Sequence, residues 1–383
     1  MPSKRLENIP GFNIDQVAKA AGNDPNVLRL ENLDTDLFPP EAAIEATRRA
    51  IGRDDDNSYL PFIGQEGLRE IIAKRLSEQT THKYQSKNVV ITCGATEAML
   101  DVLLALVDPD DEVIVTDPTY AGMINRVRLA GAVPRFLPFI PVHGEWRLDV
   151  HSLPAMINSR TRALFIMNPS MPSGAVLNMF EWEAIARQCR EHGLWLIYNA
   201  AMERILYDRR QVIHPATLPG MEALTITIGS VSKEYRMIGW RVGWVVAPGR
   251  IAEDIAKVHI YNSVSPVGIA QAGATEALRA PFADLQQAVR TWEARRDMVS
   301  TQLSEFTMIP AAGGWSQLLD VTPLGLDAPT ASKLLLQKGK VAVTPMTHWG
   351  RLNSQQFIRL VFSNEPVERL QTLGERFRRA VRK

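Results

Sequence analysis

The hydrophobic pattern alternates between two periods in the middle of the chain. Short apolar runs typical of buried strands occupy residues 88–93, 111–117, 162–168, 194–198, 223–230 and 244–248. Helical patterns lie between them, most clearly at residues 94–107 and 181–193, where Gly193 is placed to end the second helix. This alternation predicts βαβ units, and therefore an α/β fold with a mostly parallel central sheet flanked by helices.

The pattern changes near residue 290. A long charged helix is predicted from about residue 291, and three apolar runs and a terminal helix follow it, at residues 313–321, 340–345, 357–363 and 367–383. We therefore predict a large α/β domain at residues 46–289. Residues 1–45 together with residues 290–383 are predicted to form a smaller α+β domain.

Composition and charge exclude several classes of protein. The chain has 383 residues, and its 43 basic and 42 acidic side chains give a net charge of +1, which offers no electrostatic reason to expect nucleic acid or an anionic membrane. No apolar run is long enough to span a bilayer, and residues 1–10 lack the apolar stretch of a signal peptide. Cys93 and Cys189 make no disulfide framework, so we expect a cytoplasmic protein.

The stretch SVSKEYRMIGWRVGW at residues 230–244 carries the strongest chemical signal. Lys233 follows a predicted strand, next to Ser230 and Ser232, and Arg241 follows between two glycines. A single lysine is ordinarily a solvated surface charge. Within S-x-S-K-x-x-x-x-x-G-x-R-x-G, however, a lysine that forms a Schiff base beside a phosphate site is favoured, which implies pyridoxal 5′-phosphate.

A second phosphate-binding candidate opens the helix after the first strand. Its residues are Gly94, Ala95 and Thr96, whose backbone N–H groups would point at an anion beyond the carboxyl end of a strand. By itself this stretch is better explained as a plain tight turn. Together with a guanidinium that matches a phosphate dianion, it indicates one shared phosphate site.

In these motifs the chain resembles the class I/II aminotransferase family of pyridoxal-phosphate fold type I, from about residue 28 to the C-terminus. Further segments are similar in the same order. Residues 58–70 (SYLPFIGQEGLRE) resemble the segment whose tyrosine, here Tyr59, reaches a phosphate across a dimer interface. Residues 117–120 (DPTY) place Tyr120 where an aromatic ring stacks on the cofactor, and residues 357–360 (FIRL) place Arg359 where the family binds the substrate carboxylate.

The resemblance implies a homodimeric aminotransferase that moves an amino group between an amino acid and a 2-oxo acid, with sites shared between two chains. Lys233 would form the Schiff base and transfer the substrate proton. No metal is expected. The residues expected to bind the cofactor are Tyr59, Gly94, Ala95, Thr96, Tyr120, Met171, Asn199, Met202, Ser230, Ser232 and Arg241.

Three of these positions depart from the family pattern. In the turn NPSMPSG, Met171 replaces an asparagine that donates to the phenolic oxygen of the ring, and Met202 replaces a tyrosine with the same partner. Asn199 replaces the aspartate that keeps the pyridine nitrogen protonated, so the ring is expected to be a weaker electron sink. The chain then still transaminates, or is a lyase, decarboxylase or oxidase on the same scaffold, or binds the cofactor without catalysis.

The sequence gives little information about the substrate. Asp34, in LDTDLFPP, falls where the family's N-terminal segment crosses the mouth of the site, which suggests contact with a basic or polar substrate. His348 and Trp349, in PMTHWG, are candidates for the wall of the pocket. Loop capping for Asp34 and simple packing for the other two remain the alternatives.

Overall fold

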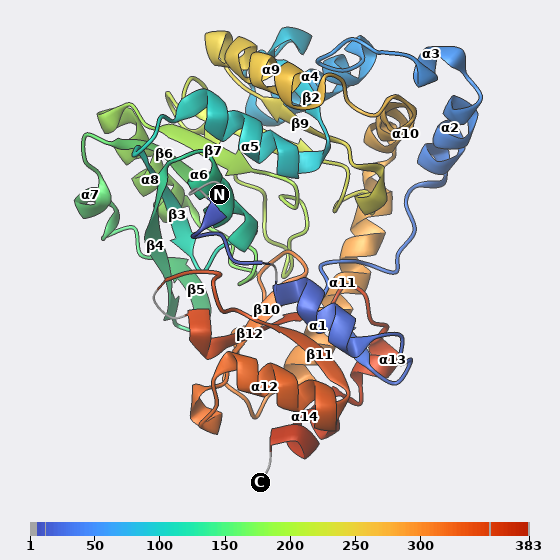
Figure 1. The fold of residues 1–383 in the computed structure, drawn as a ribbon, viewed down its shortest axis with the longest axis vertical. Coiled ribbons are helices and arrows are strands. Elements are labelled where there is room, and N and C mark those ends of the chain that lie inside the picture. The colour runs from blue at the N-terminus through green and yellow to red at the C-terminus, as the bar shows by residue number, and fades with distance from the viewer. Residues whose placement is uncertain (1–5, 12, 352–353, 382–383) are drawn as a thin grey trace.

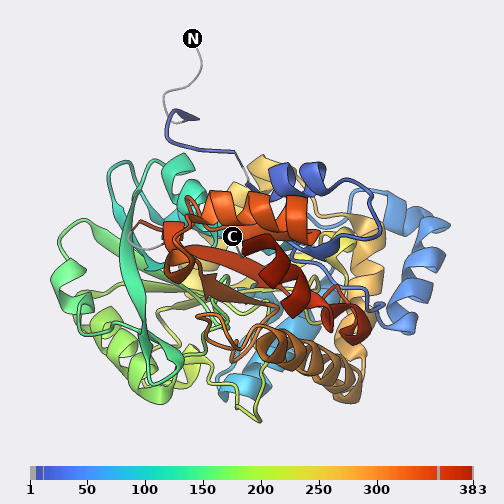
Figure 2. The same cartoon turned by 90° about the horizontal axis from the view of Figure 1, so that it is seen from below.

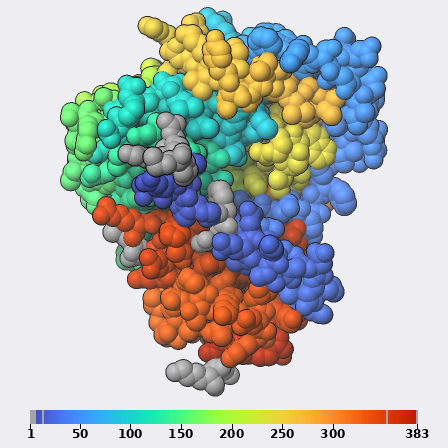
Figure 3. Space-filling model, in the orientation of Figure 1, coloured from blue at the N-terminus to red at the C-terminus, as the bar shows by residue number. Residues whose placement is uncertain are grey.

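The protein is described by a computed structural model that covers residues 6–11, 13–351 and 354–381. Figure 1 shows an upper part built around an eight-stranded sheet and a lower part built around a four-stranded sheet. The N-terminal residues, dark blue in Figure 3, lie along the junction between the two parts. Two sheets agree with the predicted organisation, whereas the domain boundaries at residues 46 and 290 stay predictions.

The large sheet is mostly parallel, as the alternating pattern predicted. Its strands β8, β7, β6, β3 and β4 pair in parallel, while β9 runs antiparallel to both of its neighbours and β5 runs antiparallel to β4. The strands in their order across the sheet are β2 (Val89–Thr92), β9 (Gly243–Val246), β8 (Thr225–Ser230), β7 (Trp195–Asn199), β6 (Thr161–Met167), β3 (Glu112–Asp117), β4 (Val133–Val142) and β5 (Glu145–Leu148).

The central strands of this sheet are buried on both faces, and helices surround the sheet, some of them packed on other helices. These helices are α2 (Glu41–Ile51), α3 (Asp54–Asn57), α4 (Glu66–Thr80), α5 (Gly94–Leu106), α6 (Ala121–Leu129), α7 (Leu153–Met156), α8 (Met179–His192), α9 (Gly249–Ser263) and α10 (Gly268–Arg279). Helix α8 shows how local sequence sets the boundaries. Asn178 and Glu181 form a reciprocal capping box at its start, and Gly193 ends it in the left-handed conformation, as predicted.

The small sheet joins the two ends of the chain. Strand β1 (Leu28–Leu30) pairs in parallel with β11 (Val341–Pro345), which is followed across the sheet by β12 (Phe357–Val361) and β10 (Ser316–Asp320). Its helices are α1 (Asn13–Ala21), α11 (Phe282–Gln302), α12 (Ala328–Leu334), α13 (Val367–Leu370) and α14 (Leu373–Val381). The predicted terminal helix is thus two helices, and its last two residues lie outside the described part of the chain.

The parallel strands bring their carboxyl ends to one edge of the large sheet. Strand β6 ends at Met167, β7 at Asn199 and β8 at Ser230, so the residues that follow these strands lie side by side. The view in Figure 2, from below, has the C-terminal elements in front of the large sheet. Ligands bind at the carboxyl ends of strands in such sheets, so this edge is where a site is expected.

Gly243 permits the close approach of β9 to the start of α5. It lies opposite Thr92 on one side and Ser230 on the other. A Cβ atom at this position would lie 2.4 Å from the carbonyl carbon of Gly94 and 2.5 Å from the nitrogen of Ala95. Both are backbone atoms, so the chain itself would have to move to make room.

We expect Gly243→Ala to lower the free energy of unfolding by about 1–3 kcal/mol, because the added methyl group overpacks the backbone. The urea midpoint of unfolding measures this change. Gly239→Ala is the matched control, because no atom lies within 4 Å of a Cβ built at Gly239. Equal midpoints for the two variants would contradict the packing argument.

Candidate active site

A cavity of about 340 Å³ lies at the carboxyl edge of the large sheet. Its lining includes most of the residues that the sequence singled out: Ala95, Thr96, Tyr120, Met171, Asn199, Ser230, Ser232, Lys233, Arg241, Trp349 and Arg359. The remaining lining residues are Ile14, Asp15, Leu33, Met99, Met167, Ala201 and Ile238. Residues from both ends of the chain and from its middle therefore meet in one space.

Lys233 is held in a protein environment that disfavours its charge. Its Nζ donates a hydrogen bond to the carbonyl oxygen of Leu33 at 2.7 Å and lies 4.9 Å from the centre of the Trp315 ring. The pKa of Lys233 is lowered to about 7, chiefly by burial and also by the positive charges of Arg359 and Arg241, while Asp34 opposes them. At neutral pH a large fraction of this amine is therefore unprotonated and nucleophilic.

Arg241 and the start of α5 form the cationic end of the cavity. Arg241 Nη1 donates to the carbonyl oxygen of Ile238 at 3.0 Å, and Nη2 donates to that of Cys93 at 3.4 Å. A Cβ atom at Gly94 would lie 2.4 Å from Arg241 Nη2, so only glycine permits this packing. The guanidinium is thereby fixed against the N-terminal turn of the helix, where free N–H groups attract an anion.

Two serine hydroxyls belong to the same end. Ser230 Oγ accepts a hydrogen bond from the backbone N–H of Ser232 at 3.0 Å and lies 2.8 Å from Ser232 Oγ. Together with Ala95 and Thr96, which also line the cavity, they provide the backbone and hydroxyl donors that a phosphate group requires. The donor set thus fits a phosphate, and the neighbouring low-pKa amine fits an aldehyde.

Arg359 occupies the wall formed by the small sheet. It is fully buried on β12, and its Nη2 donates to the carbonyl oxygen of Glu31 and to Thr344 Oγ1. Its Nε has no hydrogen-bond partner among the described residues. Burial lowers the pKa of Arg359 to about 10, against the opposing effect of Glu31, so the side chain stays cationic at neutral pH. A guanidinium in the wall of a cavity suits a carboxylate ligand.

Two aromatic rings complete the wall near Arg359. The rings of Tyr120 and Trp349 meet edge to face, with their centres 6.2 Å apart, and the Arg359 guanidinium carbon lies 4.8 Å from the centre of the Trp349 ring. The backbone N–H of Thr119 donates to the carbonyl oxygen of Trp349 at 2.8 Å, which ties this loop to the end of β3. Trp349 therefore lines the cavity, whereas His348 is exposed and does not.

Four of the predicted site residues do not line the cavity. Gly94 packs against the side chain of Arg241. Met202 is only 1 % exposed and belongs to the hydrophobic core. Asp34 is exposed, and its Oδ1 accepts a hydrogen bond from the backbone N–H of Thr35. Tyr59 is 83 % exposed, which leaves its hydroxyl free to reach another molecule.

The chain also matches known proteins along almost its whole length. Residues 26–377 match the family model of the class I and II aminotransferases. The arginine–pyruvate transaminase of Pseudomonas aeruginosa is 34 % identical over 325 residues, which cover 83 % of this chain and 81 % of the relative. The aspartate aminotransferase of Pyrococcus abyssi is 29 % identical over 99 % of this chain and 98 % of its own.

Solved structures of aminotransferases are similar to this chain as well. The aspartate aminotransferase of Thermus thermophilus, determined with maleate, superimposes with a TM-score of 0.92 at 28 % identity over 99 % of both chains. The N-succinyldiaminopimelate aminotransferase of Mycobacterium tuberculosis gives the same TM-score at 28 % identity over 98 % of this chain and 99 % of that one. The chain belongs to the class I and II aminotransferases.

The membership confirms several predictions from the sequence. The protein is a pyridoxal-phosphate-dependent aminotransferase with the fold of the aspartate aminotransferases. The relatives named above are all transaminases, so they support amino-group transfer and not the lyase, decarboxylase or oxidase alternative. Among its described helices, none combines the length and apolar character needed to cross a membrane.

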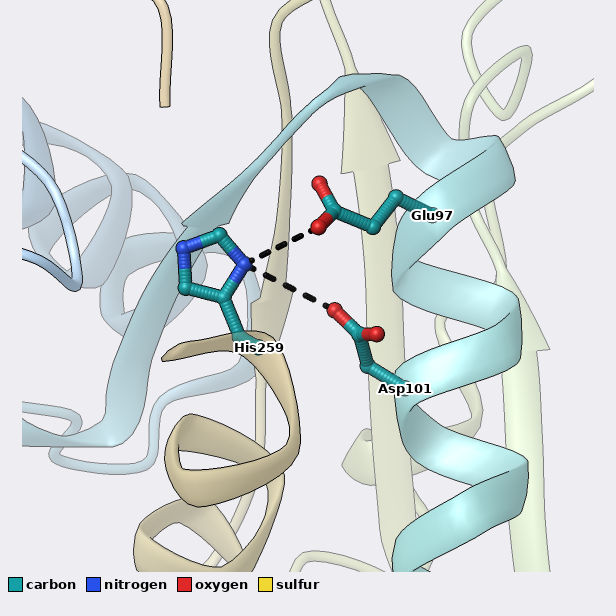
Figure 4. Close-up of side chains that lie close together, drawn as sticks. All are labelled: Glu97, Asp101 and His259. Atoms are coloured by element: carbon teal, nitrogen blue, oxygen red, sulfur yellow. Dashed lines mark hydrogen bonds and ion pairs between the residues drawn. The ribbon is translucent and has the colours of Figure 1, made fainter. Parts of the chain in front are cut away.

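A buried ionic cluster supports the cationic end of the cavity, at the start of α5. His259, on α9, is fully buried and faces two carboxylates of α5, with its Nδ1 3.2 Å from Glu97 Oε1 and 3.6 Å from Asp101 Oδ2 (Figure 4). Its Nε2 lies 3.0 Å from the carbonyl oxygen of Phe62 and must donate to it. Nδ1 therefore also carries a proton when it faces the carboxylates, and the ring is an imidazolium.

The cluster fixes the first turn of α5. Glu97 also accepts hydrogen bonds from the backbone N–H of Cys93 and from Ser263 Oγ. Burial alone would lower the pKa of His259, but hydrogen bonds with Asp101 and Glu97 outweigh it and raise the pKa to about 9. The sequence carries part of this signal, because Glu97 and Asp101 are four residues apart on one helix, but nothing local connects them to a histidine 162 residues away.

We expect His259→Gln to lower the free energy of unfolding at pH 7 by about 3 kcal/mol or more, since two buried carboxylates lose their cation. A pKa raised from 6.5 to about 9 in the folded state contributes stability fully below pH 6.5, and this contribution is lost as the pH rises through 9. The difference between wild type and variant should therefore narrow above pH 9. Urea unfolding at both pH values measures it.

His192→Gln is the control for this series, because His192 is an exposed histidine at the end of α8. It should leave the urea midpoint within the error of wild type at both pH values. A His259 variant whose deficit stays constant across the pH range would show that the imidazolium charge is not what stabilises the cluster.

Proposed function

We propose that this aminotransferase performs its reaction in the 340 Å³ cavity, with Lys233 as the amine that binds the cofactor and moves the substrate proton. The observation that carries the proposal is the position of Lys233 between two cations, with its pKa lowered to about 7. Such an amine attacks a carbonyl at neutral pH and afterwards serves as a base or an acid of suitable strength.

The Arg241 end and the Arg359 wall of the cavity bind different groups. Arg241, Ser230, Ser232 and the first turn of α5 hold the phosphate of the cofactor. Arg359, which lines the cavity, holds the α-carboxylate of the substrate. When bound, pyridoxal phosphate supplies an aldehyde for the substrate amine and a ring that accepts electrons from the substrate Cα. Tyr120 would lie beside the bound ring, and anchoring at both ends would keep Cα within reach of Lys233.

The substrate that we propose is an amino acid with an uncharged or basic side chain, exchanged with a 2-oxo acid. Lys233, Arg241 and Arg359 are the cations among the described residues that line the cavity, and each has a role already. Asp15 lines the cavity, and Asp34 follows directly after Leu33, which lines it too. Carboxylates at this position favour a cationic side chain, as the similarity to an arginine–pyruvate transaminase also suggests.

We propose that the functional unit is a homodimer in the cytoplasm. Large apolar side chains are exposed on neighbouring segments: Phe38, Ile51, Tyr59, Phe62, Tyr261, Val264 and Val267. The contact of His259 Nε2 with the carbonyl oxygen of Phe62 joins two of these segments. An apolar surface of this kind marks an interface, and Tyr59 within it would reach the phosphate of the partner. Cys93 and Cys189 are free thiols, which suits a reducing compartment.

The test of the proposed function is a half-reaction on the protein loaded with pyridoxal phosphate. Single amino acids should bleach the visible absorbance of the cofactor and release a 2-oxo acid, and added 2-oxo acid should restore the band. Arginine and apolar amino acids should react faster than aspartate. Release of ammonia or carbon dioxide in place of the 2-oxo acid would contradict transamination.

We expect Lys233→Ala to lower the rate of transamination by roughly 10²–10⁴-fold, because the proton-transfer group is lost. Borohydride reduction and peptide mapping should label position 233 in wild type only. Lys257→Ala is the matched control, since Lys257 is an exposed lysine paired with Asp254. Wild-type protein that transaminates without a borohydride label on Lys233 would overturn the assignment.

We expect Tyr59→Phe to weaken binding of pyridoxal phosphate by roughly 5- to 30-fold, the loss of one hydrogen bond to a charged group. Fluorescence titration of the apoprotein measures this affinity, and gel filtration should show a dimer for both proteins. Tyr261→Phe is the control, because Tyr261 is also a highly exposed tyrosine but is given no cofactor contact. Full affinity in a monomer would contradict the shared site.

A further inference from the structure

The carboxamide of Asn199 is oriented by the fold. Asn199 ends β7, is 4 % exposed and lines the cavity. Its Oδ1 accepts a hydrogen bond from the backbone N–H of Ala201 at 3.1 Å. The reverse orientation would place the NH₂ group against that N–H, donor against donor, so the contact identifies which atom is the oxygen. The NH₂ group is therefore the part of the amide left to face other groups.

That NH₂ group has no strong acceptor in the protein. Among the described residues, its one hydrogen-bond partner is the thioether sulfur of Met99, which also lines the cavity, at 3.8 Å. A thioether is a weak acceptor, and a buried N–H without a good partner costs free energy. The end of β7 thus presents an uncommitted donor to whatever occupies the cavity.

The family's aspartate and this asparagine consequently offer opposite partners. A carboxylate only accepts hydrogen bonds and favours a protonated pyridine nitrogen. Asn199 has an oxygen that already accepts one hydrogen bond from the backbone and an NH₂ group whose one partner among the described residues is a weak acceptor, so the NH₂ group is its freer partner. A donor matches a nitrogen that keeps its lone pair and repels one that carries hydrogen. Asp15, the one carboxylate among the described lining residues, belongs to α1, which packs on β11 of the small sheet.

We propose that Asn199 donates a hydrogen bond to the pyridine nitrogen of pyridoxal phosphate and thereby holds this nitrogen unprotonated. The inference rests on the cofactor placement proposed above, with the phosphate at Arg241 and the imine at Lys233. Asn199 is on this view a positioning residue that sets the protonation state of the ring. A protonated ring nitrogen would have to donate to Oδ1, the atom that already accepts the N–H of Ala201, and would leave the NH₂ group without a strong acceptor.

The consequence concerns how electrons are distributed during the reaction. A neutral pyridine ring withdraws less electron density than a pyridinium, so removal of the Cα proton depends more on the amine that takes it. Lys233, with its depressed basicity and its position between two cations, is the group in this cavity able to do so. The donor at position 199 keeps the ring in place without adding charge to it.

The protonation state is measured directly by ¹⁵N NMR of the wild-type apoprotein reconstituted with pyridoxal phosphate labelled at the ring nitrogen. We expect the chemical shift of a neutral pyridine at pH 7, and the shift of a pyridinium in Asn199→Asp. A pyridinium shift in wild type overturns the inference by itself, whether or not the variant folds.

A second measurement compares affinities for pyridoxal phosphate and for its N-methylated analogue, whose ring is permanently cationic. Wild type should bind the analogue at least tenfold more weakly, the equivalent of one pKa unit, and Asn199→Asp should lose or reverse this preference. Asn125→Asp is the control, because Asn125 is a buried asparagine on α6 outside the cavity whose Oδ1 accepts from Arg128. It should keep the wild-type preference.

The outcomes separate the inference from the proposed function. Borohydride labelling of Lys233 combined with a pyridinium shift retains the function and overturns the role of Asn199. Absence of label on Lys233 overturns both. Equal affinities of wild type for the two cofactors would likewise overturn the inference, because a donor facing a methylated nitrogen must weaken binding.

Discussion

The desolvation of one amine, at the junction of the two sheets, is the constraint on which this site depends. Lys233 follows β8 of the large sheet, but the oxygen that accepts its hydrogen bond belongs to Leu33, which follows β1 of the small sheet. The ring of Trp315, just before β10, covers it from the same side. The turn after β8 alone would leave a solvated lysine with an ordinary pKa. The lowered basicity therefore requires both sheets in their observed arrangement.

The charges that act on this amine also prepare the cavity for its ligands. Arg241 and Arg359 both lower the pKa of Lys233 by repulsion. Each is held by backbone carbonyl oxygens, those of Ile238 and Cys93 for Arg241 and that of Glu31 for Arg359. Carbonyl groups fix the guanidinium without neutralising it, so both cations remain available to anions. The same two side chains thus keep the amine nucleophilic and provide places for a phosphate and a carboxylate.

The sequence predicts those parts of the site that are built from local pattern. Short segments are enough to predict the strands before Lys233 and Gly94 and to interpret the glycines around Arg241. Hydrophobic alternation, turn chemistry and close backbone approach are all local properties of the chain. The partners of these residues are not local. Leu33 lies 200 residues from Lys233, and His259 lies 162 residues from Glu97. Such contacts depend on how the two sheets and α9 pack, and no periodicity in the sequence encodes that.

Asn199 shows a second limit of prediction from sequence. The sequence gives the identity of this residue but not the orientation of its side-chain amide. Whether an asparagine offers its oxygen or its nitrogen depends on which atom the backbone already occupies, here through the N–H of Ala201. Two methionines that line the cavity likewise face N–H donors without being strong acceptors. Met99 Sδ faces Asn199 Nδ2 at 3.8 Å, and Met171 Sδ faces Arg359 Nη1 at 3.9 Å.

A thioether fills space and excludes water, but it accepts hydrogen bonds only weakly. An asparagine side chain at position 171, as in the family pattern, would offer Arg359 an amide oxygen and occupy one of its donors. Methionine leaves that donor free, just as Met99 leaves the amide of Asn199 free. The sulfur atoms therefore do not merely mark the loss of polar contacts to the ring. They leave the N–H groups at two points of the cavity without a strong acceptor until a ligand with better acceptors enters. Hydrogen bonds at these points therefore contribute to ligand binding and not to the stability of the ligand-free protein.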